Sequence, residues 1–249
     1  MLSFEVMADV FAIRNELGRF FNERIYKRAL AIRRRDVQLE FPVDVVHQDF
    51  TKRYFLDVLA ANGGVFEFKV AEKLTPRHRA QLLHYLFLVG LRHGLIVNLR
   101  PEEVEREFVN AAMTQDERHN FGVEQSNWDA SLPGATDLKD ILLSILGDWG
   151  SGLELQLYEE ALTHFLGGES RVMRRMSVTF QGSPVGEQLM RLAGEAVAFK
   201  LTAFESESDA LHFDRHAQRL LAHTDLRALL WINIARRQIK FTTVRADRE

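Results

Sequence analysis

The apolar residues at the start of the chain have the spacing of an amphipathic helix. Within residues 5–33 they fall on one stripe. The members of this stripe are Val6, Val10, Ile13, Leu17, Phe20 and Phe21. Glu23 follows either on this helix or on a separate helix directly after it, before the strands begin. A second helix is predicted to begin at Thr75, a suitable N-cap, and Pro76, a suitable first helical residue, and to run to about residue 89.

Between these two helices the pattern changes to that of strands. Residues 38–46 alternate between apolar and polar side chains. Residues 54–70 form a hairpin, with Asn62-Gly63-Gly64 as its turn. Beyond the second helix, residues 95–99 form a short apolar strand and residues 104–109 a last strand or a short helix. This order predicts an α/β fold in which helices flank a mixed sheet.

Charged residues interrupt the otherwise apolar hairpin. Phe66 and Phe68 are expected to point to one face of the strand, and Glu67 and Lys69 to the other. Asp57 lies on the partner strand, close enough for its carboxylate to converge with them. A divalent cation is the best explanation, because hard cations such as Mg²⁺ bind carboxylate oxygens. For an isolated Glu-x-Lys pair, a solvated strand face is the ordinary alternative.

The order Asp57, Glu67, Lys69 resembles the core motif of the PD-(D/E)XK nucleases. Upstream, residues 16–30 resemble the opening motif of the GxxExxY proteins, a family of that superfamily. The matching residues are Gly18, Glu23, Tyr26, Ala29 and Leu30, whereas Phe20 replaces a glycine. Residues 79–98 resemble the closing helix and strand of the family. The resemblance covers about residues 7–108.

The resemblance implies a restriction-endonuclease-like α/β fold and a divalent-metal-dependent nuclease that hydrolyses phosphodiester bonds, of DNA rather than RNA. Its cofactor would be Mg²⁺ or Mn²⁺. Asp57 and Glu67 would bind this metal. The backbone carbonyl of Phe68 would be a further ligand, and Glu23 would reach the ion directly or through water.

Two further side chains complete the expected catalytic set. Lys69 would orient the attacking water and screen the phosphate charge. A general-base role is less favoured, because lysine is protonated at neutral pH and nearby carboxylates keep it so. Gln81 would lie on the helix that faces the site and hold substrate or water, or it is a surface amide with neither role.

Composition narrows the class of protein. The chain has 249 residues, 46% hydrophobic and 27% charged, as in globular proteins. It contains no cysteine, which excludes disulfides and thiolate sites and fits a cytoplasmic location. Acidic Glu5 and Asp9 argue against a signal peptide. The longest apolar stretch, residues 82–99, is too short and too interrupted by charge to span a membrane.

The net charge of −3 means that any nucleic-acid affinity must come from a local patch. One segment next to the expected site is rich in basic side chains. The candidate contacts are Lys27, Arg28, Arg33, Arg34 and Arg35. A solvated helix face with its end charged to suit the helix dipole explains these residues equally well.

The second half of the chain resembles a repeat of the first. Residues 158–162 correspond to residues 26–30, and residues 229–233 to residues 95–98. Leu155 replaces Glu23 and Ala198 replaces Glu67, so the second copy lacks the acids that hold a cation. The predicted domains are a nuclease-like domain at residues 1–109, a linker at residues 110–137 and a degenerate copy at residues 138–249.

Two other functions remain open at this point. The chain could be a catalytically silent nucleic-acid-binding or assembly module that retains the nuclease fold. It could also be a globular protein without a nucleic-acid role. No membrane partner is expected. An internal pair of copies can imitate a dimer, so both a monomer with an internal pseudo-dimer and a homodimer fit the sequence.

Overall fold

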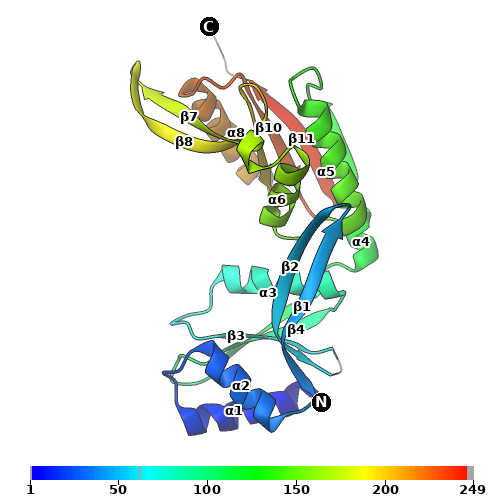
Figure 1. Ribbon diagram of the computed structural model, residues 1–249, viewed down its shortest axis with the longest axis vertical. Helices are drawn as coiled ribbons and strands as arrows, with labels where there is room; N and C mark the ends of the chain where they lie inside the picture. The colour runs from blue at the N-terminus through cyan, green and yellow to red at the C-terminus, as the bar shows by residue number, and fades with distance from the viewer. Residues whose placement is uncertain (1, 62, 246–249) are drawn as a thin grey trace. The chain divides into compact units, whose positions relative to one another are not determined.

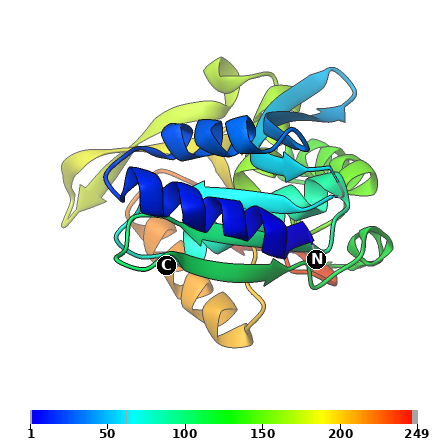
Figure 2. The same ribbon diagram turned by 90° about the horizontal axis from the view of Figure 1, so that it is seen from below.

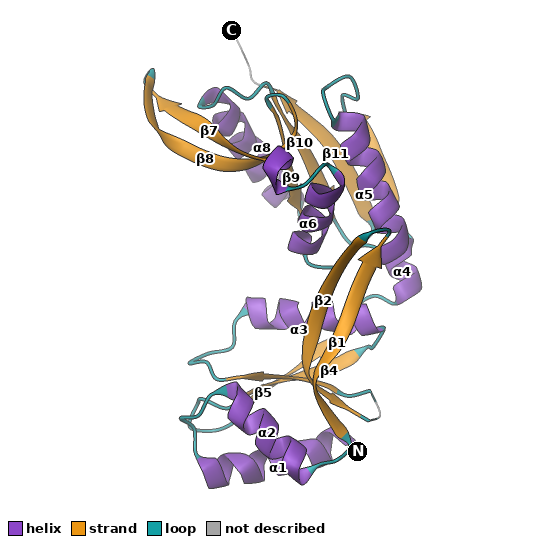
Figure 3. Ribbon diagram, viewed as in Figure 1, coloured by secondary structure: helices purple, strands orange, loops and turns teal. Residues whose placement is uncertain are grey.

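The computed structural model describes residues 2–61 and 63–245, which divide into two compact units at residues 115 and 116 (Figure 1). Each unit contains a sheet of its own with helices packed against it, as the colouring by secondary structure shows (Figure 3). Both sheets are mixed, with parallel and antiparallel pairs. The predicted fold class, a mixed sheet flanked by helices, is therefore confirmed. Among the described residues, no helix has the length and apolar content that would be needed to cross a bilayer.

The first unit contains a five-stranded sheet in the order β1-β2-β3-β4-β5. Its elements are α1 (Leu2–Leu17), α2 (Glu23–Arg33), β1 (Val37–His47), β2 (Phe50–Ala60), β3 (Val65–Lys69), α3 (Pro76–Val89), β4 (His93–Asn98) and β5 (Glu105–Asn110). Strands β3 and β4 are parallel, and the other neighbours are antiparallel. The segment at residues 104–109 is thus a strand. Of the predicted turn between β2 and β3, Asn62 lies outside the described residues.

The helical segment at residues 5–33, for which one or two helices were open, is two helices. Helix α1 ends at Leu17, and Gly18 follows with φ +80°, a conformation that favours glycine. Asn22 caps α2 by accepting a hydrogen bond from the Ile25 N–H at 3.3 Å. The two helices run side by side (Figure 2). The break removes Phe20 from the expected apolar stripe, and its side chain is exposed.

Two hydrophobic clusters cover the two faces of this sheet. Phe66 and Phe68 pack with α1 and α2 on one face. Val65 packs with α3 on the other face, together with Leu82 and Leu86. The alternation predicted for the hairpin is therefore confirmed. Residue 67 of β3 points toward the α3 side, where the apolar layer is interrupted.

The second unit contains a six-stranded sheet in the order β6-β11-β10-β9-β8-β7. Its elements are α4 (Gln115–His119), β6 (Gly122–Asn127), α5 (Ala135–Trp149), α6 (Leu155–Phe165), α7 (Glu169–Val172), β7 (Met173–Phe180), β8 (Ser183–Gly194), β9 (Val197–Thr202), α8 (Glu207–Ala222), β10 (Ala228–Ile234) and β11 (Gln238–Arg245). One face of this sheet packs against α8 through Ala198, Leu221 and Trp231.

Most of the segment predicted to be a linker, residues 110–137, folds as part of the second unit. Strand β6 pairs in parallel with β11 at the edge of the sheet. Arg118 of α4 is buried and donates to the backbone carbonyl of Ser151 at 2.7 Å. Trp128 packs edge-on against Phe241, with ring centroids 5.2 Å apart. The prediction was wrong here because an edge strand with mostly exposed side chains has no apolar alternation to detect.

The two units share an order of elements and of strand pairings, which suggests tandem duplication. In each, two long helices precede a hairpin, a further antiparallel strand, a helix and a parallel strand, and the second unit has the short α7 before its hairpin. Equivalent hydrogen bonds recur. Tyr26 donates its hydroxyl proton to the Gly18 carbonyl at 2.6 Å, and Tyr158 does the same to Gly150 at 2.6 Å.

A strand asparagine that bonds to both backbone groups of one residue recurs in the same way. Asn98 accepts from the backbone N–H of Ala71 and donates to its carbonyl, and Asn233 does both with Phe204. On the parallel ladders, Lys69 pairs with Asn98, and Thr202 pairs with Asn233. Lys69 and Thr202 are therefore equivalent positions of β3 and β9. Two residues earlier on these strands lie Glu67 and Lys200, so these two positions are equivalent as well. The sequence alignment, which matched Glu67 with Ala198, is shifted by two residues.

Candidate active site

Asp57 lies where β2 separates from β3. The paired residues of these strands are Leu59 with Val65 and Val58 with Phe66, and the pairing stops there. In its place, the Asp57 carboxylate Oδ2 accepts the backbone N–H of Phe68 at 3.0 Å. The side chain thus fills the gap between the strands and satisfies a buried donor. This geometry fixes the carboxylate beside the end of β3.

The other oxygen of Asp57 is bound by Lys27 of α2. The Lys27 Nζ lies 2.7 Å from Asp57 Oδ1 and also donates to Glu40 of β1. Burial of Lys27 lowers its pKa, but the two carboxylates outweigh this effect and raise it. Glu40 has φ +50°, a left-handed conformation rare inside a strand. Its neighbours Leu39 and Phe41 pair with Val58 and Leu56, which puts Glu40 opposite Asp57.

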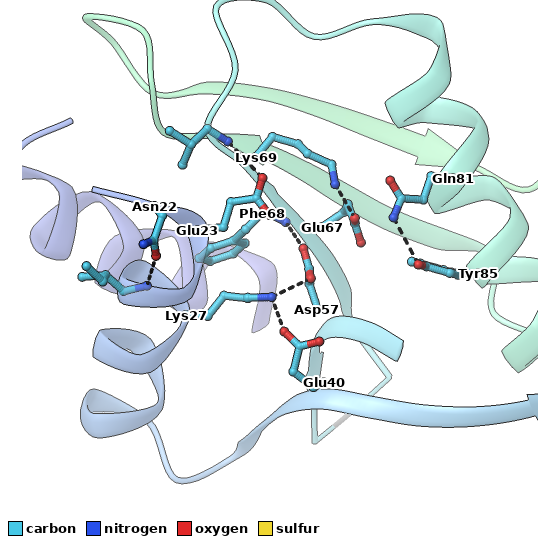
Figure 4. A network of polar contacts seen from close by, with 12 residues as sticks. Asn22, Glu23, Lys27, Glu40, Asp57, Glu67, Phe68, Lys69, Gln81 and Tyr85 are labelled. Atoms are coloured by element: carbon cyan, nitrogen blue, oxygen red, sulfur yellow. Dashed lines mark hydrogen bonds and ion pairs between the residues drawn. The ribbon is translucent and has the colours of Figure 1, made fainter. Parts of the chain in front are cut away.

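Glu67 is the most deeply buried acid of the site, with 1% of its surface exposed. Its Oε1 accepts a hydrogen bond from Lys69 Nζ at 2.7 Å. Its Oε2 is buried and has no hydrogen-bond partner among residues 2–61 and 63–245. Burial raises the pKa of Glu67 to about 7, the Asp57 charge adds to this, and Lys69 opposes it. The charge of Asp57 therefore acts on Glu67, and Figure 4 shows both carboxylates in this region.

Lys69 is held beside Glu67 on the same strand. Burial lowers the pKa of its ammonium group, but the charge of Glu67 and the hydrogen bond to it raise the pKa above the ordinary value. The charges of Glu23 and Asp57 act in the same direction. A lysine with a raised pKa carries a proton at neutral pH and donates hydrogen bonds. This is the direction expected for an orienting and electrostatic role.

The helices contribute three more polar groups to this region (Figure 4). Glu23, the first residue of α2, accepts the backbone N–H of Val70 at 3.3 Å, and its charge raises the pKa of Glu67. On α3, Gln81 Nε2 donates to the Tyr85 hydroxyl at 3.1 Å. Burial raises the pKa of Tyr85, and the charges of Glu67 and Asp57 add to it.

The basic residues expected to contact nucleic acid have different environments. Lys27 is buried and binds Asp57 and Glu40, so its assignment as a surface contact was wrong. Arg33 and Arg34 pair with acids of α1 and of the loop after α2. These pairs are Arg33 with Asp9 and Glu16, and Arg34 with Asp36, Asp9 and Glu5. Arg28 and Arg35 are exposed.

The donors at the end of β3 fit a hard divalent cation. They are carboxylate oxygens, the ligand type that Mg²⁺ and Mn²⁺ prefer. The unpartnered oxygen of Glu67 and its raised pKa mark a place where a positive charge would be stabilised. Within the described residues, no three Asp, Glu or His side chains are already arranged as a metal-binding group. The lysine contacts described above occupy one oxygen of each carboxylate instead.

Sequence reasoning missed three residues of this site. Glu40 and Lys27 were not recognised as partners of Asp57, because nothing in the local pattern distinguishes a buried lysine from its exposed neighbours on a basic helix. Tyr85 was not recognised as a residue of the site. Its spacing of four residues from Gln81, on one helical face, was the available signal.

Residues 1–110 match a protein family described as the PD-(D/E)XK nuclease superfamily. This part of the chain belongs to that superfamily. Nucleases of the PD-(D/E)XK superfamily generally depend on divalent metals. The residues that the match covers include all of the acids and lysines described above.

Comparison with solved structures gives a weaker likeness. A structure titled "Crystal structure of SSO0001" is similar at 18% identity and a TM-score of 0.30. The alignment covers 37% of this chain and 52% of that chain, about half the length of that structure. A likeness of this size establishes no shared function. No curated protein matches the chain.

Proposed function

We propose that the first unit is a divalent-cation-dependent nuclease of the GxxExxY branch that hydrolyses phosphodiester bonds of DNA. The observation that carries this proposal is the buried Oε2 of Glu67. It has no partner in the described part of the chain, and burial, with a smaller contribution from the charge of Asp57, raises the pKa of Glu67 to about 7. Such a group costs stability when it is ionised, unless a cation compensates its charge.

Asp57 and Glu67 would hold Mg²⁺ or Mn²⁺, with Glu23 and the carbonyl of Phe68 as additional donors. When bound, the cation would supply charge neutralisation and an activated water. Lys69, protonated because its pKa is raised, would hold the charged phosphate and orient the water. Gln81, fixed by its hydrogen bond to Tyr85, would position the substrate from the α3 side.

The remaining exposed cations would supply affinity for the backbone. Arg28 of α2 and Arg35 in the following loop are exposed, and they belong to the basic segment next to the site. Their contribution would depend on salt, because phosphate contacts release condensed counterions. The absence of cysteine in the chain fits a reducing cytoplasm as the place of action.

Activity assays with matched variants test this function. Single- and double-stranded DNA and RNA would be incubated with the protein and Mg²⁺ or Mn²⁺. We expect Asp57→Asn and Glu67→Gln to abolish cleavage, and Lys69→Met to lower it at least tenfold while cation affinity, measured by calorimetry, stays nearly unchanged. Glu72→Gln is the matched control, because Glu72 is exposed and pairs with Arg100. Cleavage that survives Glu67→Gln would refute the proposed site.

A catalytically silent nucleic-acid-binding module is the second candidate. The observation that favours it is that each of the two carboxylates already has a lysine partner, Lys27 for Asp57 and Lys69 for Glu67. In that case the protein would bind a nucleic acid without cutting it under any cation. Calorimetry would then show the same result for the unmodified protein and for Glu67→Gln, because no cation would bind at Glu67.

A further inference from the structure

A cavity of about 370 Å³ lies in the second unit, between β8, β9 and α8. This volume falls within the range of small-ligand pockets. Part of its lining is apolar and includes Met190 and Phe213, and another part carries the basic groups of Arg191, Lys200 and His216. None of the described residues that line the cavity is acidic.

The helix and strand residues that form ion pairs next to this cavity have charges opposite to those of their equivalents in the first unit. In the first unit, Lys27 of a helix binds the strand carboxylate of Asp57. In the second unit, Glu159 of α6 takes the place of Lys27, because each residue follows the equivalent tyrosine. Glu159 binds Arg191 of β8 at 3.1 Å and Lys200 of β9 at 3.3 Å. Lys200 occupies the strand position that Glu67 has in the first unit.

Arg191 and Lys200 together carry more positive charge than Glu159 neutralises. One carboxylate faces one guanidinium and one ammonium group, which leaves a net positive charge. The Nε of Arg191 is buried and has no hydrogen-bond partner in residues 2–61 and 63–245. Lys200 is half exposed at the cavity, so its ammonium group has donors to spare. An oxyanion that accepts from both groups would satisfy the buried donor and balance the charge.

We propose that this cavity binds a nucleoside phosphate, with the phosphate on Arg191 and Lys200 and the base against Met190 and Phe213. The ring of Phe213 is supported from behind by Trp231, whose centroid is 4.7 Å away. A fixed aromatic face next to a phosphate site is the arrangement that stacks a base. The ligand is either a free nucleotide or the phosphorylated end of a nucleic-acid strand. This inference does not depend on nuclease activity in the first unit.

Binding would be measured on the full chain by calorimetry in EDTA, so that no cation enters the first unit. The probes are inorganic phosphate, AMP, adenosine, and a phosphorothioate tetranucleotide with and without a 5′-phosphate. We expect AMP to bind at least tenfold more tightly than phosphate or adenosine alone. A tetranucleotide that binds more tightly than AMP only when it carries the 5′-phosphate assigns the site to strand ends. AMP that binds at least as tightly as the phosphorylated tetranucleotide assigns it to free nucleotides.

Variants assign the binding to the cavity. Arg191→Gln and Lys200→Gln should each weaken AMP binding at least tenfold, and Glu159→Gln should strengthen it by removing the competing carboxylate. Arg219→Gln is the matched control, because Arg219 is an exposed arginine of α8 that does not line the cavity. Asp57→Asn in the first unit should leave the affinity unchanged. Circular dichroism checks that each variant is folded.

Several results would overturn the proposal. One is the absence of saturable AMP binding at millimolar concentration. Another is an unchanged affinity in Lys200→Gln and Glu159→Gln, which tests the site even if Arg191→Gln fails to fold. A loss of binding in Asp57→Asn would assign the ligand to the first unit instead. Phosphate that binds as tightly as AMP would remove the role of the apolar wall.

Discussion

The fold raises the pKa of Glu67 into the neutral range. Its folded pKa is about 7, against 4.5 for the free side chain, because it is buried near Asp57. Between these values the unfolded chain releases the proton first, so the free energy of unfolding falls as pH rises. The total loss is on the order of 3 kcal/mol, at about 1.4 kcal/mol per pKa unit. This is opposite to the usual behaviour of a salt-bridged acid.

Glu67→Gln should remove this pH dependence. At pH 8 in EDTA, we expect the variant to be more stable than the unmodified protein by up to roughly 3 kcal/mol, because its amide carries no charge to desolvate. At pH 4 the two proteins should be similar. Urea unfolding at both pH values measures the difference. A variant that is destabilised equally at both pH values would show that the carboxylate is not the source of the effect.

Divalent cations should act in the opposite direction on the same group. With millimolar Mn²⁺ at pH 8, the unmodified protein should gain stability by mass action, about 2.7 kcal/mol at a hundredfold excess over the dissociation constant. The melting temperature of Glu67→Gln should change little on the same addition. Glu72→Gln, at an exposed site, should respond as the unmodified protein does. An equal response of all three proteins would place the cation elsewhere.

Lys27 should be the lysine whose loss destabilises the first unit most. Lys27→Met leaves the buried Asp57 carboxylate without its cation, and a broken buried pair costs roughly 3 kcal/mol. Arg53→Gln is the control, because Arg53 and Asp44 form an exposed pair, whose loss costs at most about 1 kcal/mol. Urea unfolding compares them. Equal effects of the two substitutions would mean that burial of Lys27 contributes nothing.

Part of this site was predictable from the sequence, and the residues that were not predicted share a physical reason. Asp57, Glu67 and Lys69 were found because a glycine turn and strict alternation fix their faces without tertiary information. Lys27 was misassigned because a helical wheel cannot tell which charged residue faces a carboxylate from a distant strand. Glu40 required knowledge of its left-handed backbone, which a glutamate in an alternating strand does not signal.

At the scale of elements, the two equivalent asparagines, Asn98 and Asn233, connect the end of a strand to a loop next to a helix. Asn98 on β4 is fully buried and holds both backbone groups of Ala71. Asn98→Ala and Asn233→Ala should each lower the free energy of unfolding by about 1–2 kcal/mol, since each leaves two partly buried backbone groups without their partner. The measurement is urea unfolding of the full chain.

The matching control is Asn110→Ala on β5, where the side chain bonds only to exposed His93 in the described contacts. Its effect should stay within about 0.5 kcal/mol, as for most surface substitutions. If Asn98→Ala is as mild as Asn110→Ala, the asparagine does not hold the loop. The recurrence of this contact in both units would then have no energetic basis.

The elements themselves were predictable where the pattern was local. The capping threonine and proline at α3 gave its start, and the alternation of β3 gave its faces. The sequence left open whether α1 and α2 are one helix or two, because the apolar spacing continues through Phe20 and Phe21 across a glycine. Strand β6 was missed because its pairing with β11 joins residues more than a hundred positions apart.

At the scale of the whole molecule, hydrogen-bonded sheets define the two units. Strands β1 to β5 pair only with one another among the described strands, as do β6 to β11. The division falls at residues 115 and 116. The sequence placed the end of the first domain at residue 109, within reach of this division, but placed the start of the second at residue 138. The difference is the segment that contains α4 and β6.

These two boundaries predict different behaviour of fragments. A fragment of residues 116–249 retains β6, the packing of Trp128 on Phe241 and the bonds of Arg118 to the Ser151 and Trp149 carbonyls. We expect it to unfold cooperatively in urea and to show dispersed amide signals. A fragment of residues 138–249 lacks these contacts and cuts into α5, which begins at Ala135.

The shorter fragment should therefore be less stable by several kcal/mol. It loses the packing of Trp128, the buried hydrogen bonds of Arg118 and strand β6. Its exposed β11 edge would also favour aggregation, since an unpaired edge offers backbone donors and acceptors to another chain. Size-exclusion chromatography and urea unfolding compare the two fragments at equal concentration. Equal stability and a monomeric state for both would show that residues 116–137 act as the linker that the sequence alone predicted.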